Sequence, residues 1–230
     1  MIRVIFFDFN GVIINDEPLQ MKAYQEVFEP YGIILSEAQY YGALGMDDRT
    51  FVKTTFERAG KPLTLELMAV ISKAKADRHR QLIEKDLSLF PGVVTFVKAT
   101  ARHFSLGIVS MAVREELRFV FSRTGLEQYF SVIVTAEDVS VCKPAPACYE
   151  RALERLNDKR REGRLLPVLS KECLVIEDSP PGIQSGRTAG MRTLGVTNTV
   201  SEAELRSAGA DVVTPSLFDW TVDAVRLVYV

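Results

Sequence analysis

The sequence predicts an α/β protein in which helices cover both faces of a parallel sheet and an all-helical segment follows the first strand. From residue 90 onward, apolar runs of strand length alternate with helical patterns, as expected for parallel strands joined by crossover helices. A buried strand is expected within residues 4–13, because this run is apolar and rich in β-branched and aromatic residues. Residues 17–86 show helical patterns and no strand pattern. We therefore expect a core of residues 1–15 and 88–230 with an inserted helical subdomain of residues 16–87.

Helices in the inserted segment are indicated by residues typical of helix ends. The signals are Gly32 after a helix over 17–31, a Ser36 and Gln39 capping box, Asp47 before a helix that stops at Gly60, and Thr64 before a helix to about 86. The basic face of the last helix is expected to be exposed; it carries Lys73, Lys75, Arg78 and Arg80.

The second part of the chain contains the remaining strands and helices. Strands are expected over 104–110, 131–135, 173–177, 193–196 and 211–213. One helix is expected to end near 103, and three more are expected over 114–124, 146–156 and 183–189. A capping box at Ser201 and Glu204 marks a further helix start. Residues 157–165 are interpreted as a solvated loop, because their basic stretch is short and lacks the aromatic residues of a nucleic-acid site.

Composition narrows the class of partner. The chain has 230 residues, 47% of them hydrophobic, and a net charge of -2, which gives no preference for nucleic acid or an anionic membrane. The three cysteines form no disulfide framework and no Cys/His metal pattern. No signal peptide or membrane-spanning run is evident. We expect a cytoplasmic protein, monomeric or weakly dimeric, with a small-molecule partner.

Polar residues follow successive strands of the predicted sheet at their carboxyl ends, which meet along one crevice. They are Asp8, Asn10, Ser110, Lys143, Glu177 and Asp178. Taken singly, each has an ordinary explanation as a helix cap, a loop residue or part of a turn. Their joint placement favours a site. Clustered carboxylates raise one another's pKa unless a hard cation neutralises them, and oxygen ligands of this kind suit Mg²⁺ together with a substrate phosphate.

These residues also resemble, in order, the four motifs of the haloacid dehalogenase-like hydrolases. The matching stretches are Asp8-Phe9-Asn10-Gly11-Val12, Ser110, Lys143-Pro144, and Glu177-Asp178-Ser179 with Gly182. The subgroup resembled is that of the β-phosphoglucomutases and phosphoglycolate phosphatases, which have a small helical cap. The resemblance implies a Rossmann-like core, Mg²⁺, and a phosphohydrolase that acts on a small phosphorylated metabolite through an aspartyl-phosphate.

The resemblance also implies a role for each site residue. Asp8 is the expected nucleophile. Asp178, Asp8 and the Asn10 carbonyl are the expected metal ligands, with Glu177 in an outer position. Phosphate oxygens are expected to meet Ser110, Met111 and Lys143.

Two positions depart from the family pattern. Family phosphatases have a general acid/base Asp where this chain has Asn10, and an amide has no proton to exchange. Because general acid/base catalysis contributes about 10²–10⁴-fold, a slow phosphatase is expected. Gln20 stands where sugar-phosphate mutases have a His. Arg49 and Gln20 are the expected specificity residues, although Arg49 is equally compatible with an exposed helix position paired with Asp48 or Glu57.

Two other functions stay open at this point. One is a family enzyme that hydrolyses C–halogen or C–P bonds, for which position 10 need not be an acid. The other is a catalytically silent protein that binds phosphate and metal. Turnover of small phosphate esters distinguishes these possibilities from a phosphohydrolase.

Overall fold

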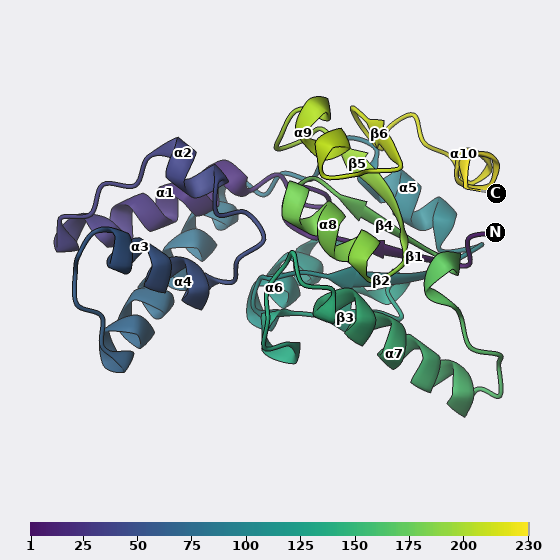
Figure 1. Cartoon of the computed structure of the whole chain (residues 1–230), viewed down its shortest axis with the longest axis horizontal. Coiled ribbons are helices and arrows are strands. Elements are labelled where there is room, and N and C mark those ends of the chain that lie inside the picture. The colour runs from purple at the N-terminus through teal and green to yellow at the C-terminus, as the bar shows by residue number, and fades with distance from the viewer. Residues whose placement is uncertain (230) are drawn as a thin grey trace.

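The computed structural model describes residues 1–229 and contains one six-stranded parallel sheet (Figure 1). Its strands are β1 (Val4–Phe7), β2 (Ser105–Val109), β3 (Val132–Val134), β4 (Cys173–Glu177), β5 (Arg192–Val196) and β6 (Val212–Thr214). They lie in the order β3-β2-β1-β4-β5-β6, so β1 is central and pairs with β2 and β4. The predicted α/β class with a Rossmann-like sheet is confirmed.

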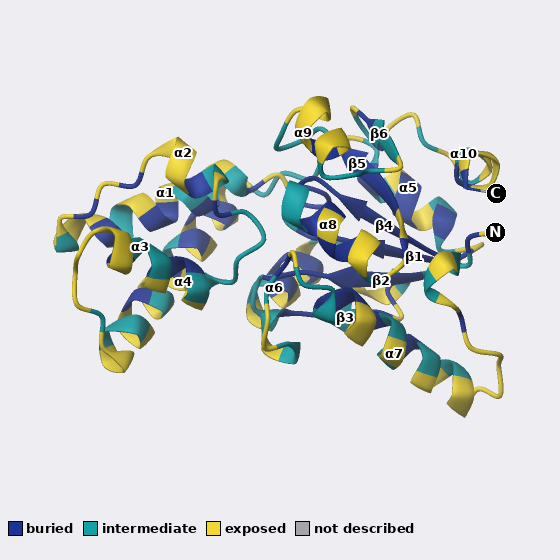
Figure 2. Ribbon diagram, in the orientation of Figure 1, coloured by how far each residue is buried: buried dark blue, intermediate teal, exposed yellow. Residues whose placement is uncertain are grey.

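Both faces of the sheet are buried, as Figure 2 shows for the central strands. Alternate residues of β1 point to opposite faces: Ile5 and Phe7 join one hydrophobic cluster, and Val4 and Phe6 join another. Helices α5 (Val93–Thr100), α6 (Arg114–Thr124) and α10 (Val222–Val228) cover the first face, whereas α7 (Ala147–Glu162) and α8 (Pro180–Thr188) cover the second. This double covering explains why the strands are apolar runs without polar alternation.

The helices of the described chain have the following bounds. They are α1 (Glu17–Phe28), α2 (Glu37–Tyr41), α3 (Asp48–Arg58), α4 (Leu65–Lys85), α5 (Val93–Thr100), α6 (Arg114–Thr124), α7 (Ala147–Glu162), α8 (Pro180–Thr188), α9 (Glu202–Ser207) and α10 (Val222–Val228). Side chains of Ser36, Asp47, Thr64 and Ser201 accept the hydrogen bonds of N-caps, as their spacing predicts.

Helices α1–α4 form a helical segment beside the carboxyl ends of the strands, on the side away from both chain termini (Figure 1). Its own hydrophobic cluster includes Tyr24, Phe28 and Phe51, whose aromatic rings pack against one another. Ile83, near the end of α4, instead belongs to the core of the sheet. The segment therefore has its own core, and α4 connects it to the sheet.

Two interpretations of the sequence are wrong, and one helix was not predicted. Residues 157–162 continue α7 instead of forming a loop, and Lys159 and Arg155 of that helix donate hydrogen bonds to carbonyls of the β3 region. Lys75 is 2% exposed and pairs with Asp48, although the basic face of α4 was expected to be solvated. Helix α10 has no counterpart among the expected elements.

Two further observations concern the whole described chain. All three cysteines are free, as expected. Among residues 1–229, no helix combines the length and the apolar character needed to cross a membrane.

Candidate active site

Strand β1 delivers Asp8 to the floor of a cavity. The strand hydrogen bonds end with the Asp8 N–H, which donates to the Ile176 carbonyl at 3.0 Å, so the next residues leave the sheet. The Asp8 side chain is 11% exposed, and its Oδ1 lies 2.7 Å from Lys143 Nζ. Burial raises the pKa of Asp8 to about 7, even though Lys143 opposes that shift. Asp8 is thus a buried carboxylate with one cationic partner and an open side toward the cavity.

Lys143 is shared between two carboxylates. Its Nζ donates to Asp8 Oδ1 at 2.7 Å, to Glu177 Oε1 at 2.6 Å and to the Val109 carbonyl at 3.3 Å. Burial alone would lower the pKa of Lys143, but Asp8 and Glu177 raise it, so the amine stays charged. Tyr149 also donates to Glu177 Oε1, at 2.6 Å. The three acceptors around the ammonium hold it in one position.

Asp178 adds a further carboxylate that no cation neutralises in the described structure. Oxygens of Asp8, Glu177 and Asp178 lie within 4.8 Å of one another and all three residues are buried. Burial raises the pKa of Asp178 well above its ordinary value, and Asp8 and Glu177 raise it further. Gly11, at φ +74°, gives the carboxylate room, because a Cβ there would lie 1.8 Å from Asp178 Oδ2. A cradle of hard oxygen ligands with excess negative charge fits a divalent cation such as Mg²⁺.

Ser110 and Asn10 lie beside these carboxylates. The Ser110 hydroxyl follows β2 and lies 3.4 Å from Asn10 Oδ1, and it also accepts a hydrogen bond from the Ala112 N–H at 3.0 Å. Met111 is buried and lines the same cavity. The structure therefore brings the residues expected at the ends of β1, β2 and β4, and Lys143, to one place. Glu177 lies behind the cavity wall and does not line it.

The cavity encloses about 100 Å³ between the sheet and the helical segment. Its ionisable acid and lysine lining residues are Asp8, Glu17, Asp48, Lys75, Glu116, Lys143 and Asp178. Acids outnumber lysines, so a phosphate dianion would meet net repulsion here unless a cation accompanied it. A cavity of this size suits a small molecule.

Two acid side chains of the helical segment reach the cavity in different states. Tyr40 donates a hydrogen bond to Glu17 at 2.6 Å, and burial raises the pKa of Glu17 to about 8. Asp48 accepts hydrogen bonds from Tyr24 and from Lys75, at 3.0 Å for the amine, which keeps its pKa below the ordinary value despite burial. Glu17 thus tends to be neutral near pH 7, whereas Asp48 is charged and paired.

The two expected specificity residues differ in position. Gln20 is buried and lines the cavity. Arg49 is exposed and does not line it, and Asp48, the neighbour once considered as its partner, binds Lys75 instead. A specificity role of Arg49 stays a prediction.

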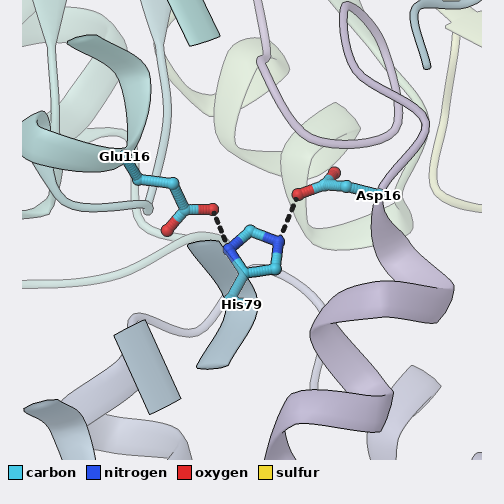
Figure 3. A group of neighbouring side chains, drawn as sticks. All are labelled: Asp16, His79 and Glu116. Atoms are coloured by element: carbon cyan, nitrogen blue, oxygen red, sulfur yellow. Dashed lines mark ion pairs between the residues drawn. The ribbon is translucent and has the colours of Figure 1, made fainter. Parts of the chain in front are cut away.

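Sequence reasoning missed a group behind Asn10. Figure 3 shows the ring of His79 between two carboxylates, with Nε2 3.1 Å from Asp16 Oδ2 and Nδ1 3.2 Å from Glu116 Oε1. Asp16 precedes α1, His79 lies on α4 and Glu116 lies on α6. One signal was available: Lys75 and His79 are four residues apart on α4, so both face the same side of that helix.

A family comparison agrees with this architecture. The model of the haloacid dehalogenase-like hydrolase family matches residues 5–196. That range extends from β1 through β5 and includes the strand ends that carry Asp8, Ser110 and Asp178.

Individual relatives cover nearly the whole chain. A phosphorylated carbohydrates phosphatase of Thermotoga maritima is 28% identical over 219 residues, which is 90% of this chain and 92% of the relative. A putative phosphatase of Bacillus subtilis is 30% identical over 207 residues, 87% of this chain and 86% of the relative. The structure of a β-phosphoglucomutase from Clostridium difficile superposes with a TM-score of 0.85 at 20% identity, over 100% of this chain and 97% of that one.

Proposed function

The chain belongs to the haloacid dehalogenase-like hydrolases, and from this premise we propose that it is a Mg²⁺-dependent phosphohydrolase acting on a small phosphorylated metabolite. In this proposal Asp8 attacks phosphorus, the leaving oxygen departs, and water then hydrolyses the aspartyl-phosphate. The names of the relatives support a phosphate ester as the substrate class.

One observation carries the proposal: Asp8 Oδ1 is fixed at 2.7 Å from Lys143 Nζ, on the floor of a cavity that Ser110 and Asp178 also line. A nucleophilic carboxylate must be positioned and must stay ionised. The ammonium holds one oxygen in place and opposes protonation of the carboxylate. Lys143 and Ser110 can then donate hydrogen bonds to the oxygens of the transferring phosphoryl group.

The carboxylates of Asp8 and Asp178 and the backbone carbonyl of Asn10 are the proposed ligands of Mg²⁺, with Glu177 supporting them from behind. When bound, the ion neutralises charge on the phosphoryl oxygens and on the carboxylates. Without such a cation, the raised pKa of Asp8 would leave much of the nucleophile protonated near pH 7.

We propose that residues 16–87 act as a cap over the site. The segment already meets the core there: the Gly45 backbone lies so near α8 that a Cβ on it would be 2.8 Å from Pro181 Cγ, and the Cys142 thiol donates to Asp47 Oδ2 at 3.1 Å. Closure of this kind excludes water from the reacting groups.

A panel of small phosphate esters, with and without Mg²⁺, tests the function. The wild type is expected to release phosphate only with Mg²⁺, Asp8→Asn to release none, and Asp158→Asn, a matched change at an exposed position, to behave as the wild type. Release of phosphate by Asp8→Asn would refute the nucleophile. Binding of phosphate without any turnover would support a silent binding protein, and turnover of haloacids or phosphonates alone would support C–halogen or C–P chemistry.

A further inference from the structure

Asn10 belongs to a network of hydrogen bonds that involves two carboxylate oxygens. Asp16 Oδ2 accepts from Asn10 Nδ2 at 2.8 Å and from Gln20 Nε2 at 3.2 Å, and lies 3.1 Å from His79 Nε2. Glu116 Oε1 accepts from Gln20 Nε2, lies 3.2 Å from His79 Nδ1 and receives a long contact of 3.5 Å from Asn10 Nδ2. Asn10, Gln20 and His79 therefore all lie against the same two carboxylate oxygens, the first two through hydrogen bonds and His79 through ion-pair contacts.

The network joins separate parts of the chain. Asp16 lies in the connection that leaves the sheet, Gln20 and His79 belong to α1 and α4 of the helical segment, and Glu116 belongs to α6 beside the sheet (Figure 3). Lys75 of α4 adds a fourth cationic or amide group, with its Nζ 3.9 Å from Glu116 Oε2. The contacts of Gln20, His79 and Lys75 with Glu116 exist only while the segment lies against α6.

His79 is placed to bind both carboxylates at once. They lie against opposite nitrogens of its ring, which is the arrangement of an imidazolium with two ion-pair partners (Figure 3). Burial alone would lower the pKa of His79, but Glu116 and Asp16 raise it above its ordinary value. The protonated ring balances part of the negative charge next to Asn10.

The network determines which way the Asn10 carboxamide points. Because its Nδ2 donates to Asp16, its Oδ1 is directed toward Ser110, at 3.4 Å, and toward the cavity. A carboxylate at position 10 would instead place an oxygen about where Nδ2 lies, within 2.8 Å of an Asp16 oxygen. Two carboxylates at that distance cannot both be ionised without a large cost. An amide at position 10 thus matches the carboxylate at position 16.

We propose that Asp16 and Glu116, held by His79, are positioning residues for Asn10, which acts as one half of an amide–carboxylate pair in the phosphohydrolase reaction. The inference rests on the proposed function and adds to it the arrangement of the residues around position 10. Held in this way, the carboxamide oxygen accepts hydrogen bonds from Ser110 and from water in the cavity, and takes no proton. Cap closure and alignment of Asn10 become one event, because closure brings His79 to Glu116.

A thermodynamic cycle tests the pairing without any use of activity. Urea unfolding at pH 8 is measured for Asn10→Asp, Asp16→Asn and the double variant, in which the carboxylate and the amide are exchanged. We expect the exchange to make the double variant more stable than the two single changes predict, by about tenfold in the folding equilibrium constant, as for residues in direct contact. Additive effects would overturn the pairing.

A kinetic comparison tests the positioning. Glu116→Gln is expected to lower kcat and leave KM nearly unchanged, and the loss is expected to vanish when Asn10 is already replaced by Ala. Glu115→Gln is the matched control, since Glu115 is exposed on the same helix and, among the described residues, forms an ion pair with Arg80 alone. An equal loss of kcat in the wild-type background and in the Asn10→Ala background would mean that Glu116 does not act through Asn10.

These two tests separate the inference from the function on which it rests. A wild type that turns over no phosphate ester refutes the proposed function, while the unfolding cycle still decides whether Asn10 and Asp16 form a pair. Turnover together with an additive cycle keeps the function and removes the positioning role.

Discussion

Replacement of Lys143 by Met is the perturbation whose effect on stability follows most directly from the structure. The ammonium lies 2.7 Å from Asp8 and 2.6 Å from Glu177, and the three side chains are between 0 and 11% exposed. Methionine keeps most of the volume but leaves two buried carboxylates without a cation. Removal of one partner from a buried ion pair costs about 3–5 kcal/mol, so we expect the free energy of unfolding to fall by about that amount at pH 8 in the absence of Mg²⁺.

Lys73→Met is a matched control. Lys73 Nζ also lies 2.7 Å from a carboxylate, that of Asp77, but both side chains are more than half exposed. An exposed pair four residues apart on a helix contributes only a small fraction of what a buried pair does, because water screens it. Replacement of Lys by Met should therefore lower the free energy of unfolding several-fold more at position 143 than at position 73. Because the ion-pair distance is the same at both sites, the difference reports the effect of burial.

The pH dependence adds a second check on Lys143→Met. In the wild type the pKa of Asp8 is about 7, far above its value in an unfolded chain, so folding favours the protonated acid. Loss of the ammonium raises this pKa further. The folded variant binds protons that the unfolded chain does not. The deficit in its free energy of unfolding, relative to the wild type, should therefore shrink as the pH falls from 9 to 6. Urea unfolding across this range is the assay; a deficit below about 1 kcal/mol, or one that grows at low pH, would refute the reasoning.

Two further predictions concern the metal and the network around His79. Asp178→Ala should weaken Mg²⁺ binding strongly in isothermal titration, because a carboxylate is lost from a hard-cation site, whereas Asp219→Ala, at an exposed position, should bind as the wild type; equal affinities would place the metal elsewhere. The stability that His79 adds through its two flanking carboxylates should be complete below about pH 6.5 and lost as the pH rises through its raised pKa, with nearby Lys75 opposing the shift. Melting temperatures of His79→Leu and the exposed control His103→Leu across pH 5.5–9 check this, and a constant difference between them would contradict it.

The sheet and the centre of the site could be predicted from the sequence because both depend on strand geometry. Asp8, Ser110 and Asp178 directly follow apolar runs, and parallel strands bring their carboxyl ends together whatever their sequence distance. Lys143 was found because it follows the third strand of this pattern. No tertiary information beyond the strand order is needed for these residues.

The residues contributed by the helical segment could not be predicted in the same way. Lys75 was interpreted as solvated because its neighbours in sequence are polar, yet α4 buries it against α3 and α6. Asp16, His79 and Glu116 lie in three different parts of the chain, and only the packing of α4 against both α1 and α6 brings them together. Local sequence patterns do not reveal that packing. The sequence therefore showed that position 10 lacks an acid, but not that the Asp16 carboxylate lies beside it.

The most direct test of the central claim is to identify the residue that becomes phosphorylated. The protein is mixed with Mg²⁺ and acetyl phosphate, quenched in acid, digested and analysed by mass spectrometry, with Asp8→Asn as the control. The account predicts one added phosphoryl group on the peptide that contains Asp8, acid-stable and removed by hydroxylamine, and none in Asp8→Asn. Turnover of phosphate esters with the phosphoryl group on another residue, or an equal label in Asp8→Asn, would contradict it.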